Sequence, residues 1–130
     1  MDIFCKIINN EIESKKIYED DIVISILDVN PRSNGHCLII PKKHYKDIED
    51  IDNNTLLHIF EVAKKISKIL EKKLNCDGIT FEQNNGIAQE VKHFHLHVIP
   101  RYKYEDITDI DEVYNILKKY ITLIACILVL

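Results

Sequence analysis

The sequence predicts an α+β fold, with an antiparallel meander sheet of about five strands, one long helix and a C-terminal helix. Two patterns predict it: short β-prone runs bounded by turn residues, and one stretch of about 20 residues with apolar side chains at helical spacing. The chain has 130 residues, of which 46% are hydrophobic and 29% charged, with three glycines and three prolines. This length and composition are typical of a single domain over residues 1–130.

Three runs in the first part of the chain favour strands. Residues 15–18 and 22–27 are β-prone, and the acidic turn at residues 19–21 between them is a hairpin signal. The third run, residues 36–40, follows an Asn-Gly turn pair and is stopped by a proline. Runs this close together can form an antiparallel meander.

In residues 54–74 the apolar side chains recur at helical spacing, which predicts a helix. Asp52 or Asn53 can cap the start of this helix, and a turn-forming run at residues 75–78 ends it. Its lysines lie largely off the apolar stripe and favour the C-terminal half of the helix dipole. The residues expected to face the core are Leu56, Ile59, Phe60, Ala63, Ile66, Leu70 and Leu74.

The rest of the chain is expected to complete the sheet and add a second helix. Residues 79–82 and 94–99 are predicted strands, joined through a turn region at residues 84–86. Residues 109–120 are a predicted helix, with acidic residues at its start and lysines at its end. The apolar run at residues 121–130 is too short to cross a bilayer, which needs about 20 apolar residues. We expect it to pack on the core or on a partner chain, the alternative being an exposed tail.

Charge and cysteine content limit the partners and the compartment. Lys and Arg number 17 against 21 Asp and Glu, a formal charge of −4, which argues against broad binding to a nucleic-acid backbone and leaves room for one small anionic ligand. The four cysteines are scattered, so a disulfide scaffold is not expected. The N-terminus has an acidic residue in place of the basic region of a signal peptide. We therefore expect a cytoplasmic protein without a membrane segment.

Three histidines at alternate positions, His93, His95 and His97, carry the strongest chemical signal. On a strand they share one face, about 6.6 Å apart, opposite a packing face of apolar residues. Packing does not explain them, because each ring has two nitrogens that need partners. Two chemistries fit: the imidazoles can ligate a metal ion, or a neutral imidazole can attack phosphorus to give a covalent intermediate.

The loop at residues 84–92, just before these histidines, favours the second chemistry. It is rich in turn formers and amide side chains, so backbone N–H groups and amides can hold phosphate oxygens. A metal site would not need such a loop.

Residues 93–99, HFHLHVI, resemble the defining motif of the histidine triad (HIT) family of nucleotide hydrolases and transferases. The resemblance covers the chain from about residue 2 to Tyr102, because other features fall in the family's order. These are an N-terminal segment at residues 3–12, a first hairpin at residues 18–21, a strand end with a ribose-binding Asp at residues 27–31, and GHCLIIPKKH at residues 35–44, which is similar to the family's G-H-x-L-(I/V)-I-P-K-x-H stretch.

This resemblance implies an α+β meander that forms a homodimer in which two sheets join, each subunit binding one purine nucleotide. It implies a nucleotidyl hydrolase that releases a nucleoside monophosphate from nucleoside phosphoramidates, nucleotide esters or dinucleoside polyphosphates through a covalent nucleotidyl-histidine. A nucleotidyl transferase and a nucleotide-binding or adaptor protein with negligible turnover are the alternatives, and a metal-binding protein is a third option. The implied chemistry requires no cofactor.

The resemblance also implies residue roles. His95 would be the nucleophile, His97 would contact phosphate, and His93 together with His36 would support the imidazole array. Asp28 would accept the ribose hydroxyls. The base would lie in an apolar slot formed by Ile3, Phe4, Ile7, Ile12, Ile26 and Val29, and the phosphates would lie along Asn84, Gln89 and Glu90.

Two positions depart from the family pattern. Many bacterial members hold zinc with a C-x-x-C pair and two histidines, but here Asp2 stands at the first cysteine position, so only Cys5, His44 and His93 match. The sequence therefore predicts no tight structural zinc and at most a remnant site. Glu90 stands where members often have Ser or Thr, and its carboxylate would repel substrate phosphates unless it points away or acts on the leaving group.

Overall fold

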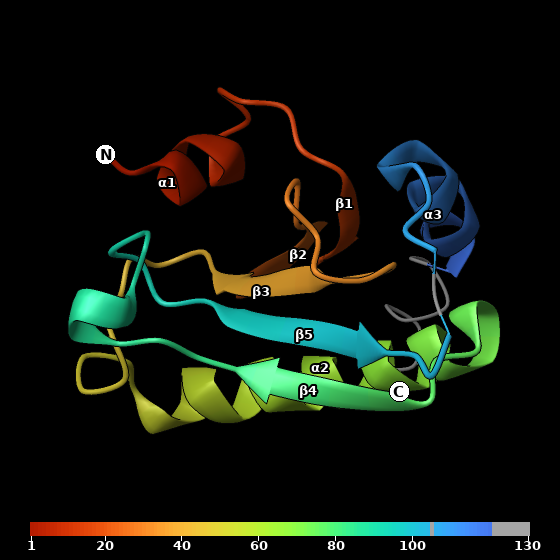
Figure 1. The fold of residues 1–130 in the computed structure, drawn as a ribbon. Helices are drawn as coiled ribbons and strands as arrows, with labels where there is room; N and C mark the ends of the chain where they lie inside the picture. Colours follow the sequence, from red (N-terminus) through yellow and green to blue (C-terminus); the bar gives the residue numbers. More distant parts are fainter. Residues whose placement is uncertain (105, 121–130) are drawn as a thin grey trace.

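Five antiparallel strands form one sheet in the order β1-β2-β3-β5-β4 (Figure 1). The computed structural model describes residues 1–104 and 106–120. The α+β class, the five strands and the meander of the first three are confirmed, and β1 and β4 are the two edges of the sheet. The strands are β1 (Lys16–Glu19), β2 (Val23–Leu27), β3 (Cys37–Pro41), β4 (Gly78–Glu82) and β5 (Leu96–Arg101).

Strand β5 lies between β3 and β4, because the chain leaves the sheet after β3 and returns through the long helix α2 (Asn53–Leu74) and β4. Across the two ladders, His97 of β5 pairs with Leu38 of β3 on one side and with Glu82 of β4 on the other. The register therefore places His97 between strands from distant parts of the chain.

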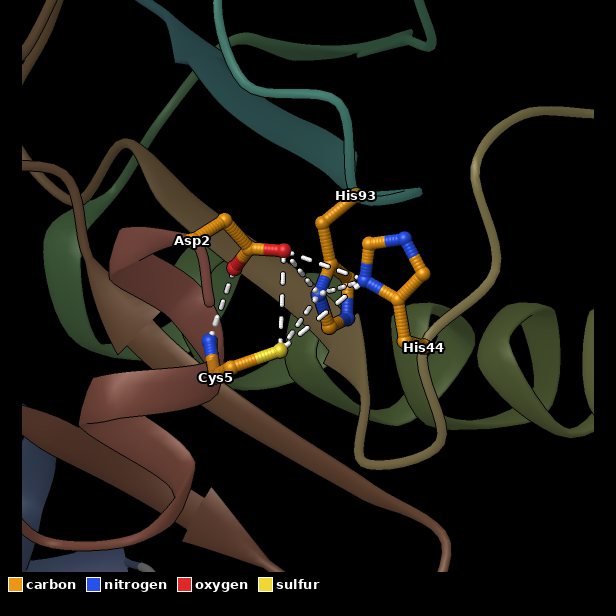
Figure 2. A group of neighbouring side chains, drawn as sticks. All are labelled: Asp2, Cys5, His44 and His93. Carbon is orange, nitrogen blue, oxygen red and sulfur yellow. Dashed lines mark hydrogen bonds and ion pairs between the residues drawn. The ribbon is translucent and has the colours of Figure 1, made fainter.

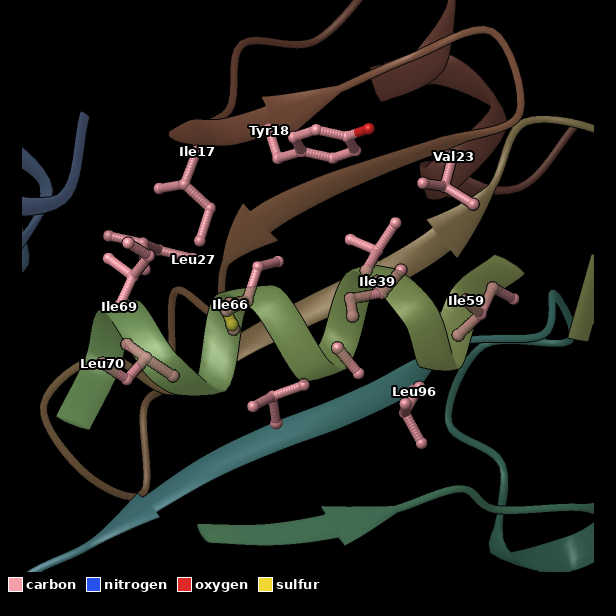
Figure 3. Close-up of a cluster of buried hydrophobic side chains, with 14 of the residues drawn as sticks. Ile17, Tyr18, Val23, Leu27, Ile39, Ile59, Ile66, Ile69, Leu70 and Leu96 are labelled. Carbon is pink, nitrogen blue, oxygen red and sulfur yellow. The ribbon is translucent and has the colours of Figure 1, made fainter. Parts of the chain in front are cut away.

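Helix α2 covers one face of the sheet, and its buried side chains form the main core (Figure 3). The carboxylate of Asp52 caps the first turn by accepting a hydrogen bond from the Thr55 backbone N–H at 3.2 Å, as the sequence predicts. Phe60 departs from the predicted apolar stripe: it is 42% exposed and meets Phe81 of β4 edge-on, with ring centroids 5.9 Å apart. The helix residues buried in the core are Ile59, Val62, Ala63, Ile66, Ile69 and Leu70.

The opposite face of the sheet carries α1 (Ile3–Ile8), a helix that the sequence patterns do not predict. It has only six residues, too few for a helical period to be recognised. Asp2 caps it, with Oδ1 accepting the Cys5 backbone N–H at 2.8 Å. Side chains alternate along a strand, so the strand residues under α1 are those that α2 does not contact. Phe4 and Ile7 pack there against Ile24, Ile26, Leu38 and Ile40.

Helix α3 (Ile110–Leu117) and the 3₁₀ segments η1 (Gly86–Ala88) and η2 (Lys118–Tyr120) complete the described chain. Val113 and Leu117 of α3 pack into the same core as α2, which confirms the second predicted helix. The apolar run at residues 121–130 lies outside the described residues. Within residues 1–104 and 106–120, no helix combines the length and apolar character needed to cross a membrane.

Candidate active site

Two adjoining pockets open on the face of the sheet that carries α1. The first, which we call the apolar pocket, has a volume of about 360 Å³, large enough for a small organic ligand. It brings together side chains from α1, the loop after it, and β2. All six residues expected to form the base slot line it: Ile3, Phe4, Ile7, Ile12, Ile26 and Val29.

The second, the polar pocket, has a volume of about 340 Å³ and shares one wall with the first. Its own lining is Arg32, His36, Glu82, Asn84 and Ala88. Five residues line both pockets, and we call their position the junction: Asp28, Asn30, Glu90, His95 and His97. A ligand with an aromatic end and a charged end therefore fits across the junction, with two imidazoles at its middle.

The hydrogen bond to a carbonyl fixes the protonated nitrogen of His95. Its Nδ1 lies 2.8 Å from the backbone oxygen of His93, which can only accept, so Nδ1 carries the hydrogen. Burial lowers the pKa of the His95 ring, which favours the neutral form. The lone pair of neutral His95 is therefore on Nε2, the nitrogen that a nucleophile needs.

A second chain of hydrogen bonds fixes His97 in the opposite tautomer. The backbone N–H of Arg32 donates to Nδ1 of His36 at 3.0 Å, so the hydrogen of neutral His36 is on Nε2. Nε2 lies 2.9 Å from Nδ1 of His97 and donates to it, which leaves His97 with its hydrogen on Nε2. Burial lowers the pKa of His36 to about 4 and also lowers the pKa of His97, so both rings are neutral at pH 7. The junction thus combines an acceptor nitrogen and a donor nitrogen on adjacent rings, whose centroids are 5.0 Å apart.

Charged groups surround these rings. Asp28 Oδ2 lies 3.5 Å from His36 Nε2 and 3.9 Å from His97 Nδ1, and its Oδ1 accepts the Asn30 backbone N–H at 2.9 Å. On the far wall, Arg32 makes a two-pronged ion pair with Glu82, at 3.0 and 2.6 Å. This pairing lowers the pKa of Glu82 to about 2.

His93 shares the α1 face with the other two histidines, as expected, since the Phe4 ring of α1 meets both the His93 and the His95 ring edge-on, with centroids 5.9 and 4.9 Å apart. The alternation extends back from the strand, which begins at Leu96, because Phe94 lies with Leu96 and Val98 in the core beside α2. The His93 ring is fully buried and lies beside Asp2, Cys5 and His44 (Figure 2). It lines neither pocket, and His36, rather than His93, contacts His97. His93 acts on the junction only through its backbone carbonyl, which accepts the hydrogen bond from His95 Nδ1.

The group at His93 fits a tetrahedral metal ion. His93 Nε2 donates to the Pro41 carbonyl at 2.9 Å, which leaves the Nδ1 lone pair facing the group. The four donor atoms, Asp2 Oδ2, Cys5 Sγ, His44 Nδ1 and His93 Nδ1, are separated pairwise by 3.0 to 3.9 Å. Tetrahedral bonds of about 2.0–2.3 Å to zinc place donors about 3.3–3.8 Å apart, so the spacing matches.

Asp2 adds a fourth donor atom to the three residues that match the family's zinc site. The sequence predicts no tight structural zinc, because Asp2 stands where many members of the family have the first cysteine. In the structure its Oδ1 caps α1 while Oδ2 lies beside the other three donor atoms, so the group offers four donors to an ion. The signal for this was present in the sequence, since Asp is a preferred N-cap residue three positions before Cys5.

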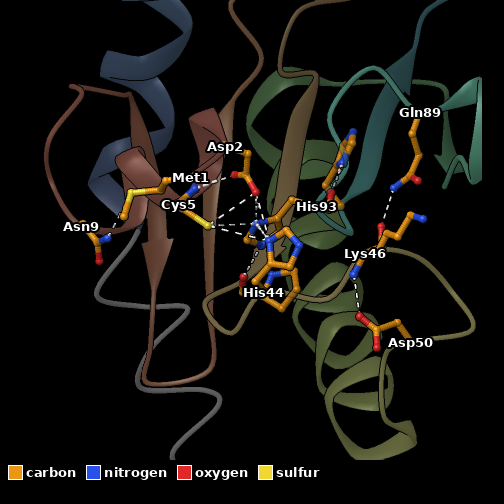
Figure 4. A network of polar contacts seen from close by, with 11 residues as sticks. Met1, Asp2, Cys5, Asn9, His44, Lys46, Asp50, Gln89 and His93 are labelled. Carbon is orange, nitrogen blue, oxygen red and sulfur yellow. Dashed lines mark hydrogen bonds and ion pairs between the residues drawn. The ribbon is translucent and has the colours of Figure 1, made fainter.

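Gln89 also lies elsewhere than expected. Its side chain is buried and its amide nitrogen donates to the Lys46 carbonyl at 2.7 Å, while the Lys46 backbone N–H donates to Asp50 at 2.8 Å (Figure 4). Gln89 therefore fixes the loop before the histidines and lines neither pocket, whereas Asn84 and Glu90 both do. The Arg32–Glu82 pair was not predicted; it joins segments 50 residues apart, and no local pattern indicates it.

Comparison with known proteins gives a consistent result. A model of the HIT domain family matches residues 9–104. A HIT-like protein of Methanocaldococcus jannaschii is 44% identical over 119 residues, covering 89% of this chain and 92% of that protein. The adenosine 5′-monophosphoramidase HNT1 of Saccharomyces cerevisiae is 43% identical over 101 residues, covering 76% and 61%. The crystal structure of a zinc-bound histidine triad protein from Mycobacterium smegmatis superposes with a TM-score of 0.86 at 31% identity, covering 96% of each chain.

Proposed function

The chain belongs to the histidine triad (HIT) family, and from this premise we propose that it is a nucleotidyl hydrolase in which His95 is the nucleophile. Its substrates are nucleoside phosphoramidates, nucleotide esters or dinucleoside polyphosphates, and its product is a nucleoside monophosphate. The observation that carries the proposal is the pair of opposite tautomers at the junction: a lone pair on His95 Nε2 beside an N–H on His97 Nε2.

Different parts of the substrate bind in the two pockets. The purine base occupies the apolar pocket, and the ribose hydroxyls donate to Asp28 at the junction. The α-phosphate then lies against His95 and His97, with the amide of Asn84 farther along the polar pocket. The six apolar side chains of the slot support a flat, largely apolar ring at that end.

The reaction proceeds in two displacements. His95 Nε2 attacks the α-phosphorus while the bond from phosphorus to the leaving nitrogen or oxygen breaks; the electron pair stays on the leaving atom, which takes a proton from solvent. The His97 Nε2–H donates to a non-bridging oxygen as charge develops on it. The ring of nucleotidyl-His95 is cationic, and its Nδ1–H donates to the His93 carbonyl. Water then attacks phosphorus, loses a proton, and releases the monophosphate and neutral His95.

The proposal is tested by intact-protein mass spectrometry after a brief, acid-free quench. The protein is mixed with an adenosine 5′-phosphoramidate or, separately, with a diadenosine polyphosphate. We expect an adenylyl adduct and release of AMP from the parent chain, and neither from His95→Ala. His58→Ala, which removes a histidine outside both pockets, should behave as the parent does. AMP binding without adduct or turnover would favour a nucleotide-binding protein instead, and transfer of the adenylyl group to added phosphate a transferase.

We further propose that Asp2, Cys5, His44 and His93 hold one zinc ion. The donor spacing and the bond from His93 to the Pro41 carbonyl support this, and the zinc-bound relative from Mycobacterium smegmatis is consistent with it. The ion would act structurally, tying α1 to the segment that precedes β5. Because His93 supplies the carbonyl that orients His95, these four residues also position the nucleophile.

We also propose that the protein acts in the cytoplasm as a homodimer in which β4 of one subunit pairs with β4 of its partner. Strand β4 is an edge, and a surface groove beside it is lined by Phe60, Phe81, Lys64, Lys68, Ser67 and Glu71. Two exposed aromatic rings next to an open edge support a self-complementary contact there.

A further inference from the structure

The leaving-group side of the site contains one carboxylate, that of Glu90, that has no partner among the described residues. Glu90 is exposed and lines both pockets. Within the described part of the chain its carboxylate makes no hydrogen bond and no ion pair. The other two acids of the polar pocket differ: Glu82 is paired with Arg32, and Asp28 accepts the Asn30 backbone N–H.

The charged residues that line the polar pocket determine its electrostatic potential. Arg32 is the only permanently charged cation among the described residues that line it, and Glu82 offsets its charge through two hydrogen bonds. Lysine side chains are absent from this lining. Since the histidines at the junction are neutral, Glu90 and Asp28 give the pocket a negative potential.

The leaving group of the substrate would lie within this negative potential. With the base in the apolar pocket and the α-phosphorus at His95, the rest of the substrate extends from the junction into the polar pocket, past Glu90. A polyphosphate leaving group would bring further negative charges close to an unpaired carboxylate. An amine would bring none, and an amine that carries an ammonium group elsewhere would be attracted.

We propose that Glu90 is a specificity residue that selects nucleoside phosphoramidates with neutral or cationic amine leaving groups over dinucleoside polyphosphates. This inference rests on the proposed function and assigns the substrate class within it. In the favoured reaction the P–N bond of the phosphoramidate breaks as the bond from His95 Nε2 to phosphorus forms, and the amine departs with the electron pair and one proton from solvent. Glu90 acts through its charge, so it needs no contact with phosphorus.

The test measures kcat/KM for three adenosine substrates: a phosphoramidate of a neutral amine, a phosphoramidate of a diamine with one free ammonium group, and diadenosine tetraphosphate. Glu90→Gln keeps the size of the side chain and removes its charge. We expect it to raise kcat/KM for the tetraphosphate about tenfold, to lower it several-fold for the ammonium substrate, and to change the neutral one by less than about twofold. Glu49→Gln, an exposed glutamate outside both pockets, should leave all three values unchanged.

The two possible failures are distinguishable. Equal changes for all three substrates in Glu90→Gln, or no change in any, would overturn the role of Glu90 while leaving hydrolysis intact. Absence of turnover for every substrate in the parent protein would overturn the proposed function. In that case the dissociation constants of the three compounds, measured by calorimetry with and without Glu90→Gln, decide the inference: a charge preference that disappears in the variant supports it, and an unchanged order of affinities refutes it.

Discussion

His36 Nε2 lies 2.9 Å from His97 Nδ1, and this contact decides which nitrogen of His97 carries the hydrogen. His36 is itself oriented by the backbone N–H of Arg32. The donor at the junction therefore depends on a residue of the loop before β3, far from the histidine motif in sequence. His95 is oriented separately, by the His93 carbonyl, so the two nitrogens that the proposed mechanism uses have independent supports.

Replacing His36 should impair the chemical step more than nucleotide binding. In His36→Ala the Nδ1 of His97 loses its donor, so the Nε2–H is no longer enforced, and we expect kcat to fall about 10- to 100-fold. AMP affinity should change less than about threefold, because His36 does not line the apolar pocket. Steady-state kinetics with an adenosine phosphoramidate and calorimetry with AMP measure the two effects. His58→Asn is the matched control, and an equal loss of kcat and affinity would contradict this role.

Burial of His36 also predicts a stability loss in mild acid. Its pKa is lowered from 6.5 to about 4, so the unfolded chain binds a proton more readily than the folded one between these values. The stabilising effect of the neutral ring is complete above pH 6.5 and is lost as the pH falls toward 4. We expect this residue to contribute at most about 3 kcal/mol to the decrease.

Urea unfolding at several values from pH 7 to 4, with a chelator present so that metal release does not contribute, measures this dependence. His36→Gln should flatten the curve within this interval, relative to its own stability at pH 7. An identical slope for the parent chain and the variant would show that other groups cause the acid sensitivity.

Patterns along the chain predict the parts of the site that lie within single elements. The strand and helix periods were sufficient for the sheet and for α2, and the family resemblance identified six of the residues that line the apolar pocket. The period-two rule held for the faces of His93 and His95, which both pack on Phe4. It could not show that the His93 ring joins a separate group of donor atoms, because that group comes from distant segments of the chain. Contacts between distant segments, such as Arg32 with Glu82, leave no local signal, and α1 is too short to have a period.

Asp2 should control metal binding separately from helix capping. Asp2→Asn keeps a side-chain oxygen for the Cys5 N–H but is a weaker ligand, so it should lower zinc affinity with little change in stability of the metal-free protein. Asp2→Cys should retain tight binding. Elemental analysis and competition with a chromophoric chelator measure affinity, and Co²⁺ substitution reports tetrahedral geometry through its visible absorption. Equal zinc content in the parent chain and Asp2→Asn would show that Asp2 is not a ligand.

The edge of the sheet at β4 should form the contact between two subunits. Phe81 is 46% exposed and stands edge-on to Phe60 of α2, so a partner strand added at β4 would cover both rings. In Phe81→Glu the new carboxylate would be buried without a partner in such a contact, which is strongly unfavourable. We expect the parent chain to sediment as a dimer at micromolar concentration and the variant as a monomer with a lower Tm.

A matched control separates loss of the contact from a general effect of surface charge. Ile22, in the turn before β2, is 43% exposed and lies outside the groove, so Ile22→Glu should leave the dimer intact. Sedimentation velocity of the three proteins, together with Tm measured over a range of concentrations, gives the answer, because only a dimer gains stability with concentration. A parent chain that sediments as a monomer, or a dimer in Phe81→Glu, would place the contact elsewhere or remove it. The apolar pocket lies beside α1, whereas the groove lies beside α2 on the other face of the sheet. AMP affinity should therefore be the same in all three proteins.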